Sequence, residues 1–161
     1  MTAYLSLGAN QGDRAGNLAA ALARLEAAGV QVERVSSLYE TAPIGGPPQP
    51  PYLNLAARVE TVLPPRELLR LCLAVEAELG RVRTVHWGPR TLDLDLLLYE
   101  GATSDDPELT LPHPRLTERQ FVLVPLAEIA PDLPLPDGRT AAESADPTNP
   151  GVKHHGPPPE V

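Results

Sequence analysis

The sequence predicts an α+β fold: a ferredoxin-like sandwich in which an antiparallel sheet carries two main helices on one face, with extra strand and helix elements toward the C-terminus. Segments that alternate apolar and polar residues predict strands, and two segments with helical spacing lie between them in the order β-α-β-β-α-β. A chain of 161 residues is also long enough to bury one core.

The first half of the chain supplies three of the expected strands and one helix. Residues 3–7 alternate apolar with polar side chains, which predicts a strand, and Gly8 with Asn10 is expected to form the turn after it. Residues 14–29 repeat Leu and Ala at helical spacing after a possible N-cap at Asp13. Segments 30–41 and 52–63 alternate again, so we expect strands two and three there, joined by a proline-rich loop.

A second helix is predicted over residues 66–80. Pro64 and Pro65 can begin a helix but cannot continue one, and the leucines that follow form one apolar stripe. Cys72 lies on this stripe, and no nearby residue offers an activating base. We therefore expect Cys72 to be a small core residue and not a nucleophile.

The C-terminal part is expected to complete one domain and then lose its order. Residues 91–99 predict a fourth strand, 109–112 a short segment, and 121–131 a strand that passes into a short helix. We assign residues 1–142 to a single catalytic domain. Residues 143–161 are rich in proline with almost no large apolar side chains, which predicts a flexible tail.

Composition excludes several classes of partner. The net charge is −8 and no block of Lys and Arg occurs, which argues against binding to nucleic acid. No apolar run approaches the roughly 20 residues that cross a bilayer, so we expect no membrane association. The single cysteine and the absence of a signal-peptide pattern predict a cytoplasmic protein. We expect a monomer.

Two acids interrupt the apolar fourth strand. Side chains alternate across a strand, so Asp93, Asp95, Leu97 and Tyr99 should share one face. The Cα atoms of the two acids would then be roughly 6–7 Å apart. Two like charges on a half-buried face repel unless cations neutralise them, and oxygen ligands suit Mg²⁺. The alternative is an ordinary pair of acids on a solvated sheet face.

Cationic side chains flank these acids in an otherwise acidic chain. Guanidinium groups bind phosphate oxygens in pairs and stay charged, so their gathering near two acids indicates phosphoryl-type transfer with a bound metal. No GxxxxGK[ST] loop occurs, so a nucleotide must be held by other means. The candidate phosphate-binding residues are Arg81, Arg83, Arg90, His113, Arg115 and Arg119.

Several segments together resemble one enzyme family. The stretch "HWGPRTLDLDLL", with "SLGAN", "YETAPIGGPPQPPYLN", "ELGRVR" and "LPHPRLTERQFVLVPLAEIAP", is similar to 6-hydroxymethyl-7,8-dihydropterin pyrophosphokinase of folate biosynthesis. The resemblance extends to about residue 138. It implies the same ferredoxin-like fold and the transfer of the β,γ-pyrophosphoryl group of ATP to the hydroxymethyl oxygen of a reduced pterin, which releases AMP.

The resemblance also implies residue roles. Asp93 and Asp95 would bind two Mg²⁺ ions, and with Arg81 and Arg90 would form the catalytic set. The residues implied to contact ATP are Glu76, Arg81, Arg83, Trp87, Arg90, Leu96, His113 and Arg119. Those implied to contact the pterin are Thr41, Pro43, Ile44, Tyr52, Asn54, Trp87, Asp93 and Phe121. Tyr52 and Phe121 would sandwich the pterin ring, although core packing explains Phe121 equally well.

Two rival functions remain open at this point. An ordinary ATP kinase would transfer one phosphate and release ADP. A non-catalytic ligand-binding module would share the fold, because fold does not dictate function. One departure from the family is Glu108, which stands where some members have an arginine before the segment 109–112.

Overall fold

The computed structural model describes residues 1–41, 50–81 and 92–159. Pro43, Ile44, Arg83, Trp87 and Arg90, all predicted for the site, lie outside these ranges. The elements in chain order are β1 (Thr2–Ala9), α1 (Arg14–Ala27), β2 (Gln31–Val35), β3 (Leu38–Thr41), β4 (Tyr52–Glu60), α2 (Pro65–Arg81), β5 (Asp93–Tyr99), β6 (Ser104–Asp106), β7 (Leu109–Leu111), α3 (Gln120–Ile129), α4 (Ala141–Ser144) and β8 (Val152–Gly156).

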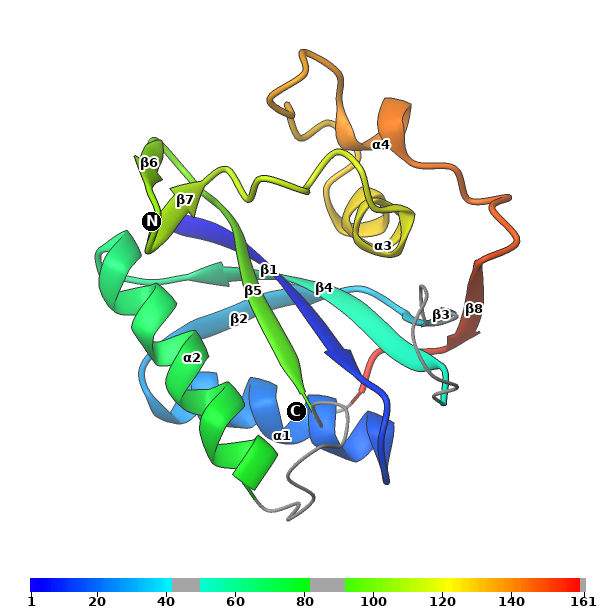
Figure 1. The fold of residues 1–161 in the computed structure, drawn as a ribbon, viewed down its shortest axis with the longest axis horizontal. Helices are drawn as coiled ribbons and strands as arrows, with labels where there is room; N and C mark the ends of the chain where they lie inside the picture. The colour runs from blue at the N-terminus through cyan, green and yellow to red at the C-terminus, as the bar shows by residue number, and fades with distance from the viewer. Residues whose placement is uncertain (42–49, 82–91, 160–161) are drawn as a thin grey trace.

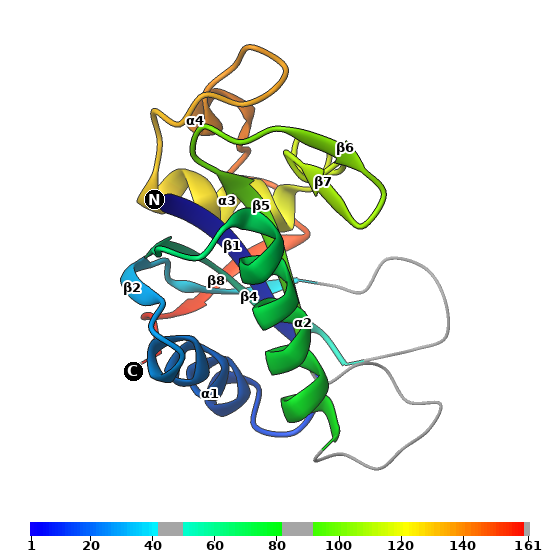
Figure 2. The same ribbon diagram turned by 90° about the vertical axis from the view of Figure 1, so that its left-hand side faces the viewer.

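The main sheet is antiparallel, with strand order β5-β1-β4-β3-β8 and with β2 also paired to β4. Helices α1 and α2 cover one face, and α3 lies against the other (Figures 1 and 2). The predicted α+β class, with an antiparallel sheet and two main helices on one face, is therefore confirmed. In the described ranges no helix is long and apolar enough to cross a membrane.

Each face of the sheet has its own buried cluster. The larger cluster joins β1, β4 and β5 to α1 and α2, and the smaller one joins Ala56 and Leu97 to α3. Cys72 is fully buried in the larger cluster, and burial raises the pKa of its thiol to about 12. A thiol that stays protonated is a poor nucleophile, in agreement with the core role expected from the sequence.

The segment 30–41 was predicted as one strand, but it forms two, β2 and β3. Ser36 and Ser37 separate them, and the Ser36 hydroxyl donates to the Ser37 carbonyl at 2.8 Å. The Ser36 hydroxyl also accepts from the Ala56 amide at 2.9 Å, so the chain stays attached to β4 through the break. Serine hydroxyls compete with the backbone in this way, which explains the interruption.

The prediction of a strand at the start of segment 121–131 is wrong, because α3 is helical from Gln120 to Ile129. The apolar run that suggested a strand includes Val122, Leu126 and Ile129, which are buried at helical spacing. An unbroken apolar run does not distinguish a buried strand from a buried helix by periodicity.

The tail also differs from expectation. Residues 143–161 were predicted to be flexible, but Val152–Gly156 forms β8 and pairs antiparallel with β3. The rings of His154 and Tyr39 lie edge to face, with centroids 5.7 Å apart. Backbone pairing along the free edge of β3 holds this segment, so its lack of large apolar side chains did not reveal it. The boundary at residue 142 stays a prediction.

Candidate active site

Strand β5 presents its two acids on the sheet face that α3 covers. Leu94 and Leu96 point to the cluster under α2, whereas Leu97 packs in the cluster under α3. Asp93 and Asp95 alternate with these leucines and are half-buried at the end of the strand nearest residue 92. The predicted shared face of the two acids therefore agrees with the alternation of the buried leucines.

The expectation for the end of β5 is wrong. The pairing with β1 shifts between Tyr4↔Leu98 and Leu5↔Leu96, so Leu97 is an extra residue in a β-bulge. Beyond the bulge the faces exchange: Leu98 packs in the α3 cluster and Tyr99 in the α2 cluster. A bulge between Asp93 and Asp95 would have put the two carboxylates on opposite faces. The bulge lies after Asp95, so both acids keep a common face.

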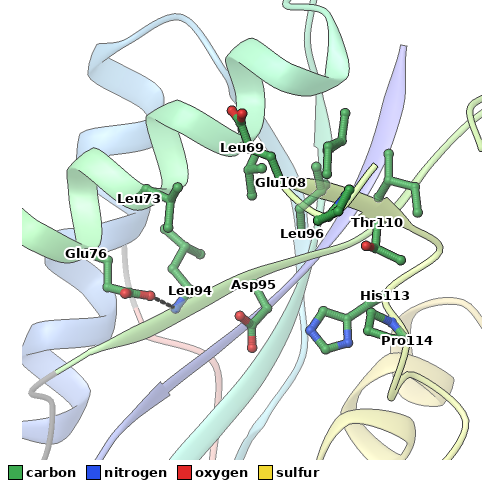
Figure 3. A pocket seen from close by; sticks show the side chains of 13 residues that line it. Leu69, Leu73, Glu76, Leu94, Asp95, Leu96, Glu108, Thr110, His113 and Pro114 are labelled. Atoms are coloured by element: carbon green, nitrogen blue, oxygen red, sulfur yellow. Dashed lines mark hydrogen bonds between the residues drawn. The ribbon is translucent and has the colours of Figure 1, made fainter. Parts of the chain in front are cut away.

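Within the described residues the outer edge of β5 has no strand partner, and two other groups hydrogen-bond to its backbone. The Glu76 carboxylate on α2 accepts from the Leu94 amide at 3.0 Å (Figure 3). The His113 amide donates to the Leu97 carbonyl at 2.8 Å. Glu76 thus attaches α2 to the residue between the two acids, and His113 is held beside the same strand.

A cavity of about 280 Å³ lies along this edge, between α2 and the β6–β7 hairpin. Figure 3 shows Asp95 and His113 facing each other at one side of it. The walls are largely aliphatic, as in pockets that take a flat organic ring. Its lining includes residues predicted for the site, namely Glu76, Asp95, Leu96 and His113, and also Leu69 and Thr110. Leu69 on α2 and Thr110 on β7 were not anticipated, because the cavity exists only where α2 and the folded hairpin lie side by side.

His113 is electrostatically linked to the neighbouring site residues. Partial burial lowers the pKa of its imidazole below the usual 6.5, the Asp95 carboxylate opposes this effect, and Arg119 and Arg115 add to it. A lowered pKa keeps His113 neutral near pH 7. Because the neutral form is favoured on folding, this contribution to stability is present above pH 6.5 and is lost as the pH falls through the folded pKa.

We predict that Asp95→Asn lowers the pKa of His113 further, because the substitution removes the charge that favours the imidazolium. An NMR titration of the imidazole signals would measure it. Asp132→Asn, on an exposed loop, is the control and should leave the His113 pKa unchanged. A higher His113 pKa in the Asp95→Asn variant than in the wild type would contradict the proximity of His113 and Asp95.

Helix α3 begins with two further predicted residues. The Arg119 guanidinium lies over the Phe121 ring, 5.4 Å from its centroid. Phe121 is half-buried and packs on the α3 cluster. The ring therefore has a core contact and a cation contact, and its stacking on a ligand stays a prediction.

Strands β3 and β4 bring together the polar residues predicted to bind a flat ring. Asn54 is buried, and its Nδ2 donates to the Thr41 Oγ1 at 2.6 Å. Tyr52 is two residues before Asn54 on the same face of β4 and is opposite Thr41. Across β1, Gly8 pairs with both Asn54 and Asp93. Asp93 and Asn54 therefore lie on the same face, separated by one strand.

Arg14 fixes the strand ends beside Thr41 and Tyr52. Its Nη1 donates to the Glu40 carboxylate and to the Pro51 carbonyl, each at 3.0 Å. Glu40 is the penultimate residue of β3 and Pro51 directly precedes β4, so one guanidinium joins both strand ends. The alternation rule gave no indication of this contact, because it depends on the position of α1.

Glu108 takes part in an ion-pair network at the rim of the cavity. Its carboxylate lies 3.1 Å from Arg66 and 3.2 Å from Arg70, and Arg66 also lies 2.9 Å from Asp106. The two arginines are on α2 and the two acids on the β6–β7 hairpin. The residue that departs from the expected arginine therefore attaches one wall of the cavity to the other.

We predict that Glu108→Gln speeds amide exchange in β7 by roughly two- to tenfold, because two exposed ion pairs of modest strength are lost. Hydrogen exchange followed by mass spectrometry would measure the change. Asp105→Asn is the matched control, since Asp105 is on the same hairpin and forms no ion pair within the described ranges. Equal effects of both substitutions would show that the network does not hold the hairpin.

The two acids suit a metal ion whose remaining coordination positions are filled by substrate phosphates and water. No group of three or more His, Cys, Asp or Glu that could hold a metal ion occurs among the described residues. Asp93 and Asp95 together supply carboxylate oxygens on one half-buried face. Mg²⁺ is commonly bound by one or two carboxylates together with substrate phosphates and water, so this donor set suits it.

Comparison with known proteins places the chain among pterin enzymes. The family model described as 7,8-dihydro-6-hydroxymethylpterin-pyrophosphokinase (HPPK) matches residues 4–131. The chain is 51% identical over 143 residues to the 2-amino-4-hydroxy-6-hydroxymethyldihydropteridine pyrophosphokinase of Methylorubrum extorquens, covering 88% of this chain and 90% of that one. It is 52% identical over 128 residues to the Bacillus subtilis enzyme of the same name, with 79% and 77% covered.

Solved structures agree at the level of fold. A crystal structure of HPPK-DHPS in complex with substrates aligns with a TM-score of 0.66 at 12% identity, covering 89% of this chain and 42% of that one. The wild-type Plasmodium falciparum HPPK-DHPS aligns with a TM-score of 0.64 at 16% identity, with 89% and 40% covered. The chain thus spans less than half of those longer proteins.

Proposed function

Because the chain belongs to the 7,8-dihydro-6-hydroxymethylpterin-pyrophosphokinase family, we propose that it transfers the β,γ-pyrophosphoryl group of ATP to the hydroxymethyl oxygen of 6-hydroxymethyl-7,8-dihydropterin and releases AMP. It is a pyrophosphokinase of folate biosynthesis. The observation that carries the proposal is the position of the acids. Asp95 borders the cavity beside His113, and Asp93 is one strand away from Asn54.

ATP occupies the cavity at the edge of β5 in this proposal. The aliphatic walls would receive the adenine ring, and Leu96 would contact it. Glu76 keeps α2 attached to β5 through the Leu94 amide. His113 and Arg119 would bind the triphosphate, joined by Arg81 at the end of α2 and by Arg83, Trp87 and Arg90.

The pterin lies on the other side of the acids. Asn54 would hydrogen-bond its polar edge, and Tyr52 and Phe121 would contact its faces. Thr41 orients the Asn54 amide, while Pro43, Ile44 and Trp87 would complete the pocket. This arrangement would place the hydroxymethyl oxygen near Asp93, between the two subsites.

Two Mg²⁺ ions held by Asp93 and Asp95 would neutralise charge on the phosphate oxygens during transfer. The chain's own residues then bind and orient the reactants. His113 and Arg119 would hold the migrating group in line with the hydroxymethyl oxygen, because phosphoryl-type transfer depends mainly on positioning and charge stabilisation.

The broader assignments follow the same proposal. The sheet order, with the last core strand beside the first and α1 and α2 on one face, supports a ferredoxin-like sandwich. A monomeric state, a cytoplasmic location and the absence of nucleic-acid or membrane partners stay predictions of the sequence.

A product assay tests the proposal. The purified chain is incubated with ATP, Mg²⁺ and 6-hydroxymethyl-7,8-dihydropterin, and the nucleotides are separated. AMP should form in a one-to-one ratio with the pterin diphosphate, and EDTA should abolish it. ADP as the product would identify an ordinary kinase, and binding without turnover would identify a ligand-binding module.

A further inference from the structure

Gly8 occupies an unusual position near the end of β1. It is in the middle strand of three, opposite Asp93 on β5 and Asn54 on β4. Glycine weakens a strand interior and often marks a place where another group approaches closely. Gly8 does not have a positive φ, so its backbone conformation is open to any residue. The reason for glycine here is therefore space.

The space above Gly8 is taken by a site side chain. A Cβ at this position would lie 2.6 Å from Asn54 Oδ1, 3.6 Å from Asn54 Cγ and 3.6 Å from Tyr52 Cδ1. Real Cβ atoms essentially never approach another heavy atom within 3.0 Å. The Asn54 amide thus lies directly over the Gly8 Cα, with the Tyr52 ring beside it.

The Asn54 amide has little freedom to move away. Its Nδ2 end is held by the 2.6 Å hydrogen bond to the Thr41 hydroxyl, and both residues are buried. Rotation to escape a Cβ would break this bond, and leaving a buried polar group without its partner costs free energy. A methyl group at position 8 would therefore turn or shift the amide.

We propose that Gly8 is a positioning residue for the pterin subsite: its missing side chain lets the Asn54 amide lie across β1 with Oδ1 toward Gly8 and Nδ2 fixed on Thr41. This inference rests on the proposed function and adds a residue to it. The ligand class it selects is a flat heteroaromatic ring with a polar edge, read by an amide whose orientation is fixed from two sides. The nucleotide cavity lies beyond Asp95, on the other side of β5, and is independent of Gly8.

Gly8→Ala tests the inference through steady-state kinetics and ligand binding. We expect the KM for the pterin to rise at least about tenfold, while kcat at saturating pterin and the Kd for a non-hydrolysable ATP analogue with Mg²⁺ change less than about twofold. Gly156→Ala is the matched control, because a Cβ there meets nothing within 4 Å. Its kinetic constants should equal those of the wild type.

A double-mutant cycle shows whether Gly8 acts through Asn54. In an Asn54→Ala background, Gly8→Ala should add no further rise in KM, because the amide it displaces is already absent. An equal additional rise in that background, a parallel loss of ATP-analogue binding, or an unchanged KM in the single variant would each overturn the inference. If Gly8→Ala alone does not fold, a folded double variant with the pterin KM of Asn54→Ala supports it, and an unfolded double variant contradicts it.

The wild-type reaction separates the two levels of argument. A wild type that forms no AMP contradicts the proposed function and this inference with it. A wild type that forms AMP, with Gly8→Ala unchanged in its pterin KM, contradicts the inference alone.

Discussion

Asp95→Asn should lower kcat by about 1,000-fold while the fold survives. The substitution removes one metal-binding charge and leaves a side chain of the same shape, and losing a group that stabilises transition-state charge commonly costs this much. Asp95 is half-buried beside Asp93, so its neutralisation relieves a like-charge repulsion and should not destabilise the sheet. AMP formation at saturating substrates, with thermal unfolding of the same preparation, measures both effects.

The controls make this result specific to the acid pair. Asp93→Asn should behave like Asp95→Asn, and Asp132→Asn, on an exposed loop, should retain full turnover. Raising the Mg²⁺ concentration should recover part of the activity of the Asp93 and Asp95 variants, because weaker metal binding is the expected defect. It should leave the activity of the control unchanged. A variant at Asp95 that turns over normally would remove the acids from the mechanism.

The sequence predicted best the elements in which the spacing of apolar residues matches the pattern of buried side chains. The α2 stripe and the alternate apolar residues of β1 and β4 all enter the larger cluster, so residue spacing alone indicates these elements. Segment 121–131 failed because α3 is apolar nearly all round, and such a run carries no period. The strand β8 was missed for the opposite reason: its stability comes from backbone pairing with β3, to which composition is insensitive.

The candidate site shows the same division. Asp93 and Asp95 could be placed on one face because two-residue alternation holds up to the bulge at Leu97. The reversed faces of Leu98 and Tyr99 could not be foreseen, because a bulge leaves no periodic signal in the sequence. The cavity required tertiary knowledge, since Thr110 and Glu108 reach it only through the β6–β7 hairpin. Gly8 was predicted in a turn after the first strand, but it lies within β1 and pairs with Asn54, so its place beside the site was not foreseen.

Asn54→Leu should raise the KM for the pterin by at least about 100-fold and change the Kd for ATP little. Leucine has the same number and branching of side-chain heavy atoms as asparagine, is somewhat larger, and offers neither a donor nor an acceptor. A pocket built to hydrogen-bond its ligand loses far more from a missing polar partner than from a small change of shape. The Thr41 hydroxyl would also lose the Nδ2 donor that reaches it at 2.6 Å.

Stability and binding should respond differently to this substitution. Asn54 is the third residue of β4 and its amide is in a buried contact, so a variant with an apolar side chain of the same branching is expected to fold, with an unfolding free energy within about 1–2 kcal/mol of the wild type. Thr41→Val is the companion variant: it keeps the shape of Thr41 and removes the oxygen that orients the amide. A smaller rise in pterin KM for Thr41→Val than for Asn54→Leu would identify Asn54 as the contact and Thr41 as its support, whereas a normal KM for Asn54→Leu would exclude the amide from pterin recognition.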